Sequence, residues 1–160
     1  VMLRFLLGVV RADFYNPVSQ FLIRITNPLL LPMRKVIPSL GRYDTSALLL
    51  MLLLPCISLG VVVLLRGISV SVVTLLIVAV GELVMLAINV FMFAIIIQVI
   101  LSWINQGNYN PVTALLYSIT SPIMRPLQRL IPPISGIDLS PLVAIIGLQV
   151  LRMLIMPLLG

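Results

Sequence analysis

The fold is decided by the segment at residues 16–48, NPVSQFLIRITNPLLLPMRKVIPSLGRYDTSAL, which returns at residues 110–142 as NPVTALLYSITSPIMRPLQRLIPPISGIDLSPL. The two copies align without a gap at a shift of 94 residues (110 − 16 = 94). The matching positions include the initial Asn-Pro, three further prolines and the Asp-x-Ser near the end of each copy. An excess of Leu and Ile could not align these residues, so we infer an internal duplication. It divides the chain into a first repeat (1–66), a short apolar connector (67–82) and a second repeat (83–160).

Composition indicates a membrane protein. Of the 160 residues, 61% are hydrophobic and 9% are charged, and the mean hydropathy is +1.26. A soluble domain has about 45–50% apolar and about 25% charged residues. The polar residues are too few to cover a globule, so we expect an integral membrane protein.

The residue counts also exclude several kinds of site. The chain has no His, one Cys (Cys56) and four acidic residues that lie far apart in the sequence. One thiol without imidazoles cannot form a zinc site or an internal disulfide. We therefore expect no enzyme and no cofactor. The net charge of +6 comes from scattered basic residues, which favours topology and lipid contact over nucleic-acid binding.

Four apolar runs predict about four transmembrane helices in an all-α membrane protein. Residues 1–10 are interpreted as the truncated end of a first helix, and residues 45–65, 83–104 and 139–159 as three spans. A run of about 21 residues extends about 31 Å as a helix, which is enough to cross the hydrocarbon. Residues 68–80 are too few for a span. They could lie in the interface or extend the helix that follows.

We call the repeated segments at residues 16–38 and 110–132 the elbows. Asn16-Pro17 and Asn110-Pro111 predict helix starts, because Asn caps a helix and Pro suits its first position. A second start is predicted at Pro28 in one copy and Pro122 in the other, which gives two helices of about 10 residues per elbow. Helices this short cannot span a bilayer.

We expect these short helices to lie in the headgroup layer; a re-entrant hairpin is the alternative. Four basic residues are expected to face lipid phosphates or a partner. These are Arg34, Lys35, Arg125 and Arg129.

An aspartate, Asp44 or Asp138, precedes the span in each repeat. Each carboxylate should lie near the positive end of the next helix. There it could pair with Arg34, Lys35 or Arg129 and hold the elbow to the span. Ser140-Pro141 predicts the N-cap and first residue of the last span. A role in proton relay is the alternative for both aspartates.

The distribution of charge predicts a topology. Both elbows are basic, whereas the opposite connection has only Arg66, offset by Glu82. The positive-inside rule places both elbows in the cytoplasm. The repeats would then be parallel, with a symmetry axis along the membrane normal.

Polar residues within the apolar runs are candidates for function. They are Arg4, Glu82, Asn89, Gln98, Gln149 and Arg152. Helix–helix hydrogen bonding, or snorkelling for Arg152, is the favoured interpretation. Glu82 is expected near the outer surface, where it could pair with Arg66.

The elbow pattern resembles the YggT family. The resemblance is carried most closely by Asn110-Pro111, Ile119-Thr120-Ser121-Pro122, Arg129-Leu130-Ile131-Pro132 and Asp138-Leu139-Ser140-Pro141. Gln128 stands where the family often has a second Arg. The resemblance implies a bacterial inner-membrane protein, or a relative in cyanobacteria and plastids. It links the chain to osmotic tolerance, to cell division or nucleoid organisation, and in plastids to haem attachment on a cytochrome b. It supplies no catalytic residues. Family members usually have more chain before the position of Val1.

Two functions follow as hypotheses. The first is a non-enzymatic membrane scaffold or assembly factor that presents two basic elbows to anionic lipid and to a membrane-protein partner. The second is a small channel or transporter subunit active in osmotic or ion stress, since duplicated spans with proline-interrupted segments also occur in transporters.

Overall fold

A computed structural model describes residues 1–37, 44–104, 110–133 and 138–158, and every regular element in these ranges is helical. The helices are α1 (Met2–Val9), α2 (Pro17–Val36), α3 (Thr45–Arg66), α4 (Val72–Ile104), α5 (Pro111–Leu130) and α6 (Ser140–Ile155), followed by the 3-10 turn η1 (Met156–Leu158). The repeated Pro38 and the basic residue Arg42 that follows the first elbow lie outside the described residues. The expected all-α class is confirmed.

Helices α3 and α4 form a hairpin around Gly67. This residue has φ +65°, a left-handed conformation that glycine adopts without a steric penalty. The amides of Gly67 and Ile68 donate to the last carbonyls of α3, at 3.2 and 3.3 Å, and so end that helix. The chain then enters α4 after Ser71, whose hydroxyl accepts from the amide of Thr74 at 3.1 Å.

The early start of α4 corrects the prediction for this region. Most of residues 68–80 extend the following helix, which was one of the two possibilities, and the span expected at 83–104 begins 11 residues earlier, at Val72. A serine cap preceded by the Gly67 turn was the signal for this start. At 33 residues, α4 is about 50 Å long, which exceeds the hydrocarbon thickness of about 30 Å.

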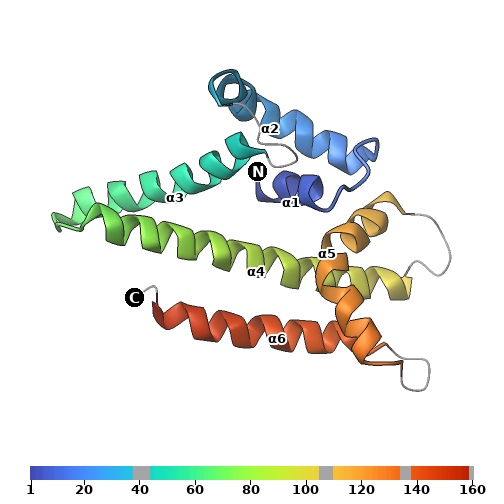
Figure 1. Ribbon diagram of the computed structural model, residues 1–160. Coiled ribbons are helices and arrows are strands. Elements are labelled where there is room, and N and C mark those ends of the chain that lie inside the picture. The colour runs from blue at the N-terminus through green and yellow to red at the C-terminus, as the bar shows by residue number, and fades with distance from the viewer. Residues whose placement is uncertain (38–43, 105–109, 134–137, 159–160) are drawn as a thin grey trace.

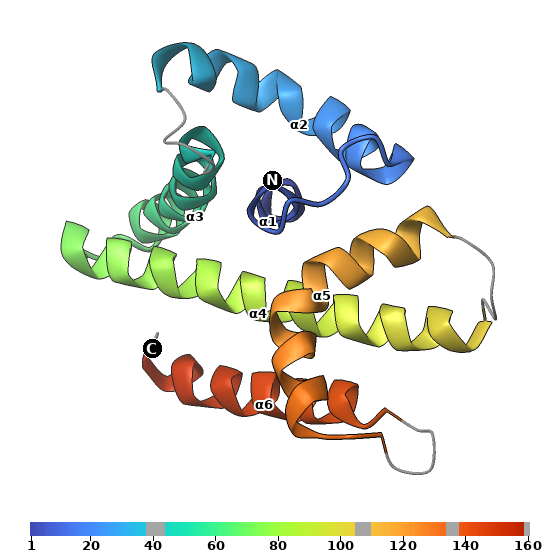
Figure 2. The ribbon, with the colours of Figure 1, turned by 45° about the vertical axis from the view of Figure 1, so that its right-hand side comes forward.

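Helix α4 is the central helix of the molecule. It packs against α3, α5 and α6. Both α3 and α6 run antiparallel to α4, so they point in the same direction (Figures 1 and 2). The starts of α3 and α6, which follow the two elbows, consequently lie away from the α3–α4 turn.

Two helices, α3 and α4, are long and apolar enough to cross a membrane. Their most apolar windows are only 11% and 22% buried within the protein, so these are not the core helices of a soluble domain. Large apolar side chains cover their outer surfaces, as expected for helices in lipid. Helix α6 is apolar but has 16 residues, and α1 has 8. The chain is therefore membrane-associated.

Each elbow forms one continuous 20-residue helix, α2 or α5. The prediction of two short helices per elbow is wrong, because the chain stays helical through Pro28 and Pro122. Figure 1 shows α5 bending near its middle. Pro122 cannot donate to the carbonyl of Ser118, four residues earlier. The hydroxyl of Ser121 donates to that carbonyl at 2.9 Å. A side chain thus satisfies the acceptor that the proline leaves free, and the helix continues.

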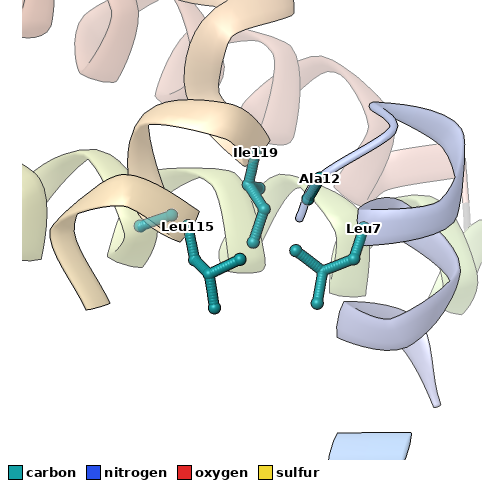
Figure 3. Close-up of a cluster of buried hydrophobic side chains, with 5 residues drawn as sticks. Leu7, Ala12, Leu115 and Ile119 are labelled. Atoms are coloured by element: carbon teal, nitrogen blue, oxygen red, sulfur yellow. The ribbon is translucent and has the colours of Figure 1, made fainter. Parts of the chain in front are cut away.

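A buried apolar cluster joins the two repeats. Leu115 and Ile119 of α5 pack with Ala94 of α4 and with Leu7 and Ala12 from the first repeat (Figure 3). The corresponding positions of α2, Phe21 and Ile25, are exposed. Ile119 is 4% exposed and its counterpart Ile25 is 57% exposed. The equivalent apolar stripes therefore have different tertiary partners.

Candidate membrane-interface site

The same cap begins both elbow helices. The Oδ1 atom of Asn16 accepts from the amide of Val18 at 2.9 Å, and that of Asn110 accepts from the amide of Val112 at 2.9 Å. Pro17 and Pro111 occupy the first helical position, as predicted. The amide group of Asn16 also donates to the carbonyl of Pro111 at 2.8 Å. One cap therefore ties the start of α2 to the start of α5.

At the other end of α2, an ion pair joins the elbow to the span. Arg34 binds the carboxylate of Asp44, which also accepts from the amide of Ala47 at 3.2 Å and caps α3. This is one of the expected pairings. Burial of Asp44 would raise the pKa of its carboxyl, but hydrogen bonds from Arg34 and the Ala47 amide, with the Arg34 charge, hold that pKa below its usual value. We call this arrangement the first carboxylate contact.

The second carboxylate contact joins α5 to α6. Gln128 donates to Asp138 at 2.9 Å, and Asp138 accepts from the amide of Ser140 at 2.9 Å. Gln128 is the counterpart of Arg34 (128 − 94 = 34). The partner of Asp138 is therefore this amide and not the expected Arg129. Burial would raise the pKa of Asp138, but hydrogen bonds from Ser140 and Gln128 lower it.

Ser140 corrects one detail of the prediction. It is the first residue of α6, and the N-cap residue is Leu139, whose side chain makes no capping hydrogen bond. Among the residues that the structure describes, the buried hydroxyl of Ser140 has no hydrogen-bond partner. The counterpart Ser46 donates to the carbonyl of Ile37 at 3.2 Å. Asp138 supplies the hydrogen bond to the first turn that Ser140 was expected to make.

Each elbow helix also makes a side-chain hydrogen bond near its middle, and the residues involved in the two repeats are 94 positions apart. Arg4 donates to Thr26 at 2.6 Å and to Asn27 at 2.8 Å, just before Pro28. In the other repeat, the hydroxyl of Thr120 donates to Gln98. Gln98 and Thr120 are buried, so they connect α4 to α5 as helix–helix hydrogen bonds.

The exposed basic residues lie on the outer surfaces of the elbow helices. Arg125 and Arg129, four residues apart on α5, border a shallow depression with Ser121. Lys35 is exposed near the end of α2, whereas Arg34 is engaged by Asp44. The free cationic surface is therefore more concentrated on α5.

The polar candidates of the long helices remain separate. Glu82 is exposed on α4, 10 residues past its start (82 − 72 = 10), and Asn89 is half-buried. Arg152 is half-buried on α6. Within the described ranges, Glu82 forms no ion pair, so the expected pairing with Arg66 is absent. No cluster of three potential metal ligands occurs among those same residues.

Comparison with known proteins assigns the family. The chain matches the profile of the CCB3/YggT family over residues 1–65 and 69–159. It belongs to the CCB3/YggT family. An uncharacterized protein of Pseudomonas aeruginosa is 42% identical over 157 residues, covering 97% of this chain and 80% of that protein. An uncharacterized protein of Vibrio alginolyticus is 37% identical, covering 100% and 87%. The uncharacterized protein YggT of Escherichia coli K12 is 32% identical, covering 96% and 79%. No solved structure matches the chain.

This CCB3/YggT chain also has a groove that the sequence patterns did not indicate. The groove lies between the end of α4, α5 and the start of α6, and has a volume of about 680 Å³. Its lining includes Gln98, Trp103, Tyr117, Gln128, Asp138 and Leu142. The repeated pattern did not indicate Trp103 and Tyr117 as groove residues, because neither is repeated: the first repeat has Val9 and Ile23 at the matching positions. A comparison of the repeats at those positions was the available signal.

Proposed function

We propose that this protein is a non-enzymatic, multi-pass component of the bacterial inner membrane. In this proposal α2 and α5 lie at the cytoplasmic headgroup layer, bind anionic lipid, and present a surface to a membrane-protein partner. The two repeats are parallel, and α1 and α6 belong to the remaining two spans. The main support for the proposal is the distance along α4, measured from the α3–α4 turn, at which α5 crosses it.

That level follows from helix lengths. Ala94 of α4 packs against α5 and lies 22 residues past the start of α4 (94 − 72 = 22), or about 33 Å along the axis. Helix α3 has 22 residues and is also about 33 Å long. The α5 crossing and the start of α3 are thus both one hydrocarbon thickness from the α3–α4 turn. A proline-containing helix with exposed arginines suits the headgroup layer at that depth.

The exposed cations of α5 support contact with lipid phosphate. Arg125 and Arg129 lie on one helix face beside the hydroxyl of Ser121. Guanidinium groups bind phosphate oxygens with paired hydrogen bonds. The positive-inside rule supports the cytoplasmic side for this surface.

Single-cysteine labelling tests the orientation. In a Cys56→Ser background, the thiols introduced by Lys35→Cys and Arg129→Cys should react with a membrane-permeant maleimide but not with an impermeant one added outside, because both positions face the cytoplasm. Ile68→Cys, at the opposite turn, should react with an impermeant maleimide added outside. Outside labelling at position 35 or 129 would refute the common cytoplasmic orientation.

Partner binding is tested separately. Purification in mild detergent should recover a membrane protein in a fixed ratio, and Arg125→Gln/Arg129→Gln should reduce that ratio or the retention of anionic lipid. Arg66→Gln, which removes an exposed cation at the opposite turn, is the matched control. A chain that is recovered alone under every condition, with no retained anionic lipid, would refute a scaffold role.

A channel subunit is the second candidate, and Glu82 is the observation that favours it. In the proposed membrane position its exposed carboxylate lies about 15 Å from the start of α4, near the bilayer centre. Such a group could line a pore formed between copies. Reconstituted protein should then conduct cations during an osmotic shift, and Glu82→Gln should reduce the flux. Absence of flux from pure protein would eliminate this candidate.

A further inference from the structure

We infer that the groove between α4, α5 and α6 binds the primary ammonium headgroup of a phospholipid. The inference rests on the proposed location of this end of α4 at the headgroup layer. It concerns a different surface from the arginines of α5, and a headgroup of the opposite charge.

The charge of the groove is the first argument. Among the described residues that line the groove, Asp138 is the only one that carries a charge at neutral pH. In the first repeat the same carboxylate is neutralised by Arg34, but in the second the neutral amide of Gln128 takes that place. A hydrogen bond from an amide leaves the negative charge of Asp138 uncompensated. A cation is the complementary ligand.

The second argument comes from four substitutions between the repeats. Arg4 and Arg34 of the first repeat correspond to Gln98 and Gln128 of the groove. Val9 and Ile23 correspond to Trp103 and Tyr117. The second repeat has therefore lost two cations and gained two aromatic rings around one carboxylate. Each change favours a bound cation, because aromatic faces attract an ammonium group and fixed arginines repel it.

The apolar lining indicates a lipid and not a free amine. Ile96 and Ile100 of α4 and Leu142 and Ile145 of α6 line the same groove as Asp138. An amphiphile can place its ammonium group against Asp138 and the rings, and lay an acyl chain along these side chains. Trp103 and Tyr117 are both exposed, as is usual for aromatic residues at a membrane interface.

The chain provides its own reporter, because Trp103 is its one tryptophan. The full chain is reconstituted into phosphatidylcholine nanodiscs that contain a small fraction of acyl-brominated phosphatidylethanolamine or acyl-brominated phosphatidylglycerol. Bromine quenches a nearby indole, so the quenching at equal mole fraction measures which headgroup is enriched beside Trp103. We expect a preference of about fivefold for phosphatidylethanolamine, from one exposed charge pair with one cation–π contact.

Three variants assign the preference to the groove. Gln128→Arg introduces the ion pair of the first repeat into the second. This variant should abolish the preference for phosphatidylethanolamine, while circular dichroism should show that the helices remain intact. Asp138→Asn should abolish the preference as well, and Arg66→Gln, an exposed cation at the opposite end of the molecule, should leave it unchanged. A preference that survives both Gln128→Arg and Asp138→Asn would overturn the assignment to this carboxylate.

Two further outcomes separate the possible failures. Soluble glycerophosphoethanolamine should not relieve the quenching; relief at the same concentration as the lipid would overturn a site for lipid. Equal quenching by both brominated lipids would overturn the inference. If the maleimide pattern above still holds in that case, the proposed function stands. Labelling of positions 35 and 129 from outside would instead refute the proposed function.

Discussion

Two substitutions of Asp44 can separate the interactions that join the first elbow helix, α2, to α3. Asp44 makes two separable interactions, an ion pair with Arg34 and a cap on the amide of Ala47. Asp44→Asn removes the charge but keeps a good capping residue. Asp44→Ala removes both. The two variants should therefore destabilise the protein by different amounts.

The expected magnitudes follow from exposure. The side chains of Arg34 and Asp44 are 41% and 19% exposed, so solvent screens the pair. A screened pair contributes about 0.5 kcal/mol, and a helix cap about 1 kcal/mol. We expect a loss of about 0.5 kcal/mol for Asp44→Asn and about 1.5 kcal/mol for Asp44→Ala. Arg34→Gln, which copies the second repeat, should match Asp44→Asn.

Unfolding by sodium dodecyl sulfate from mild-detergent micelles, followed by far-ultraviolet circular dichroism, measures these losses. The pH dependence adds a check of sign. Burial alone would raise the pKa of Asp44, but Arg34 and the Ala47 amide lower it below the ordinary 3.8. The stability from this group is present above the unfolded pKa and is lost as the pH falls through the folded pKa. The difference between wild type and Asp44→Asn should thus vanish in strong acid. Equal losses for Asn and Ala, or a difference that persists in acid, would refute the two-part contact.

Three other pairs of substitutions test the fold by the same unfolding measurement. Ile119→Ala should cost about 2–4 kcal/mol because the side chain is buried, whereas its exposed counterpart Ile25→Ala should cost under about 0.5 kcal/mol; equal losses would contradict the unequal packing of the elbows. Asn16→Ala should cost about 2 kcal/mol, from a cap and a hydrogen bond to Pro111, and Asn110→Ala about 1 kcal/mol, so a larger loss at Asn110 would contradict the link between the helix starts. Gly67→Ala should cost about 1 kcal/mol, since alanine is strained at φ +65°, while the helical Gly60→Ala should be neutral or stabilising; the reverse order would contradict the turn.

Local signals in the sequence predicted the helix starts but not the continuity of the elbows. The side chains of Asn16 and Asn110 each accept from an amide only two residues later, so these caps could be predicted from the local sequence. Pro28 and Pro122 were misinterpreted as breaks because a proline in a sequence does not show which side chain will replace its lost hydrogen bond. In α5 that side chain is Ser121.

Tertiary partners account for the remaining differences. Ile25 and Ile119 are identical residues in matching stripes, but Ile119 belongs to a buried cluster with Leu7, Ala12 and Ala94, whereas Ile25 is exposed. The pairing of Asp44 with Arg34 was among the expected options because opposite charges lie close along the chain. The groove at Trp103 depends on three helices, and no single stretch of sequence contains it.

The central position of α4 limits how the molecule can move. Helix α4 begins at Val72, after the Gly67 turn, packs along α3, and continues to its contacts with α5 and α6. A transport cycle in which the first repeat rocks against the second would have to bend α4 or separate it from α3. Any such cycle would therefore break contacts along the longest helix of the described residues.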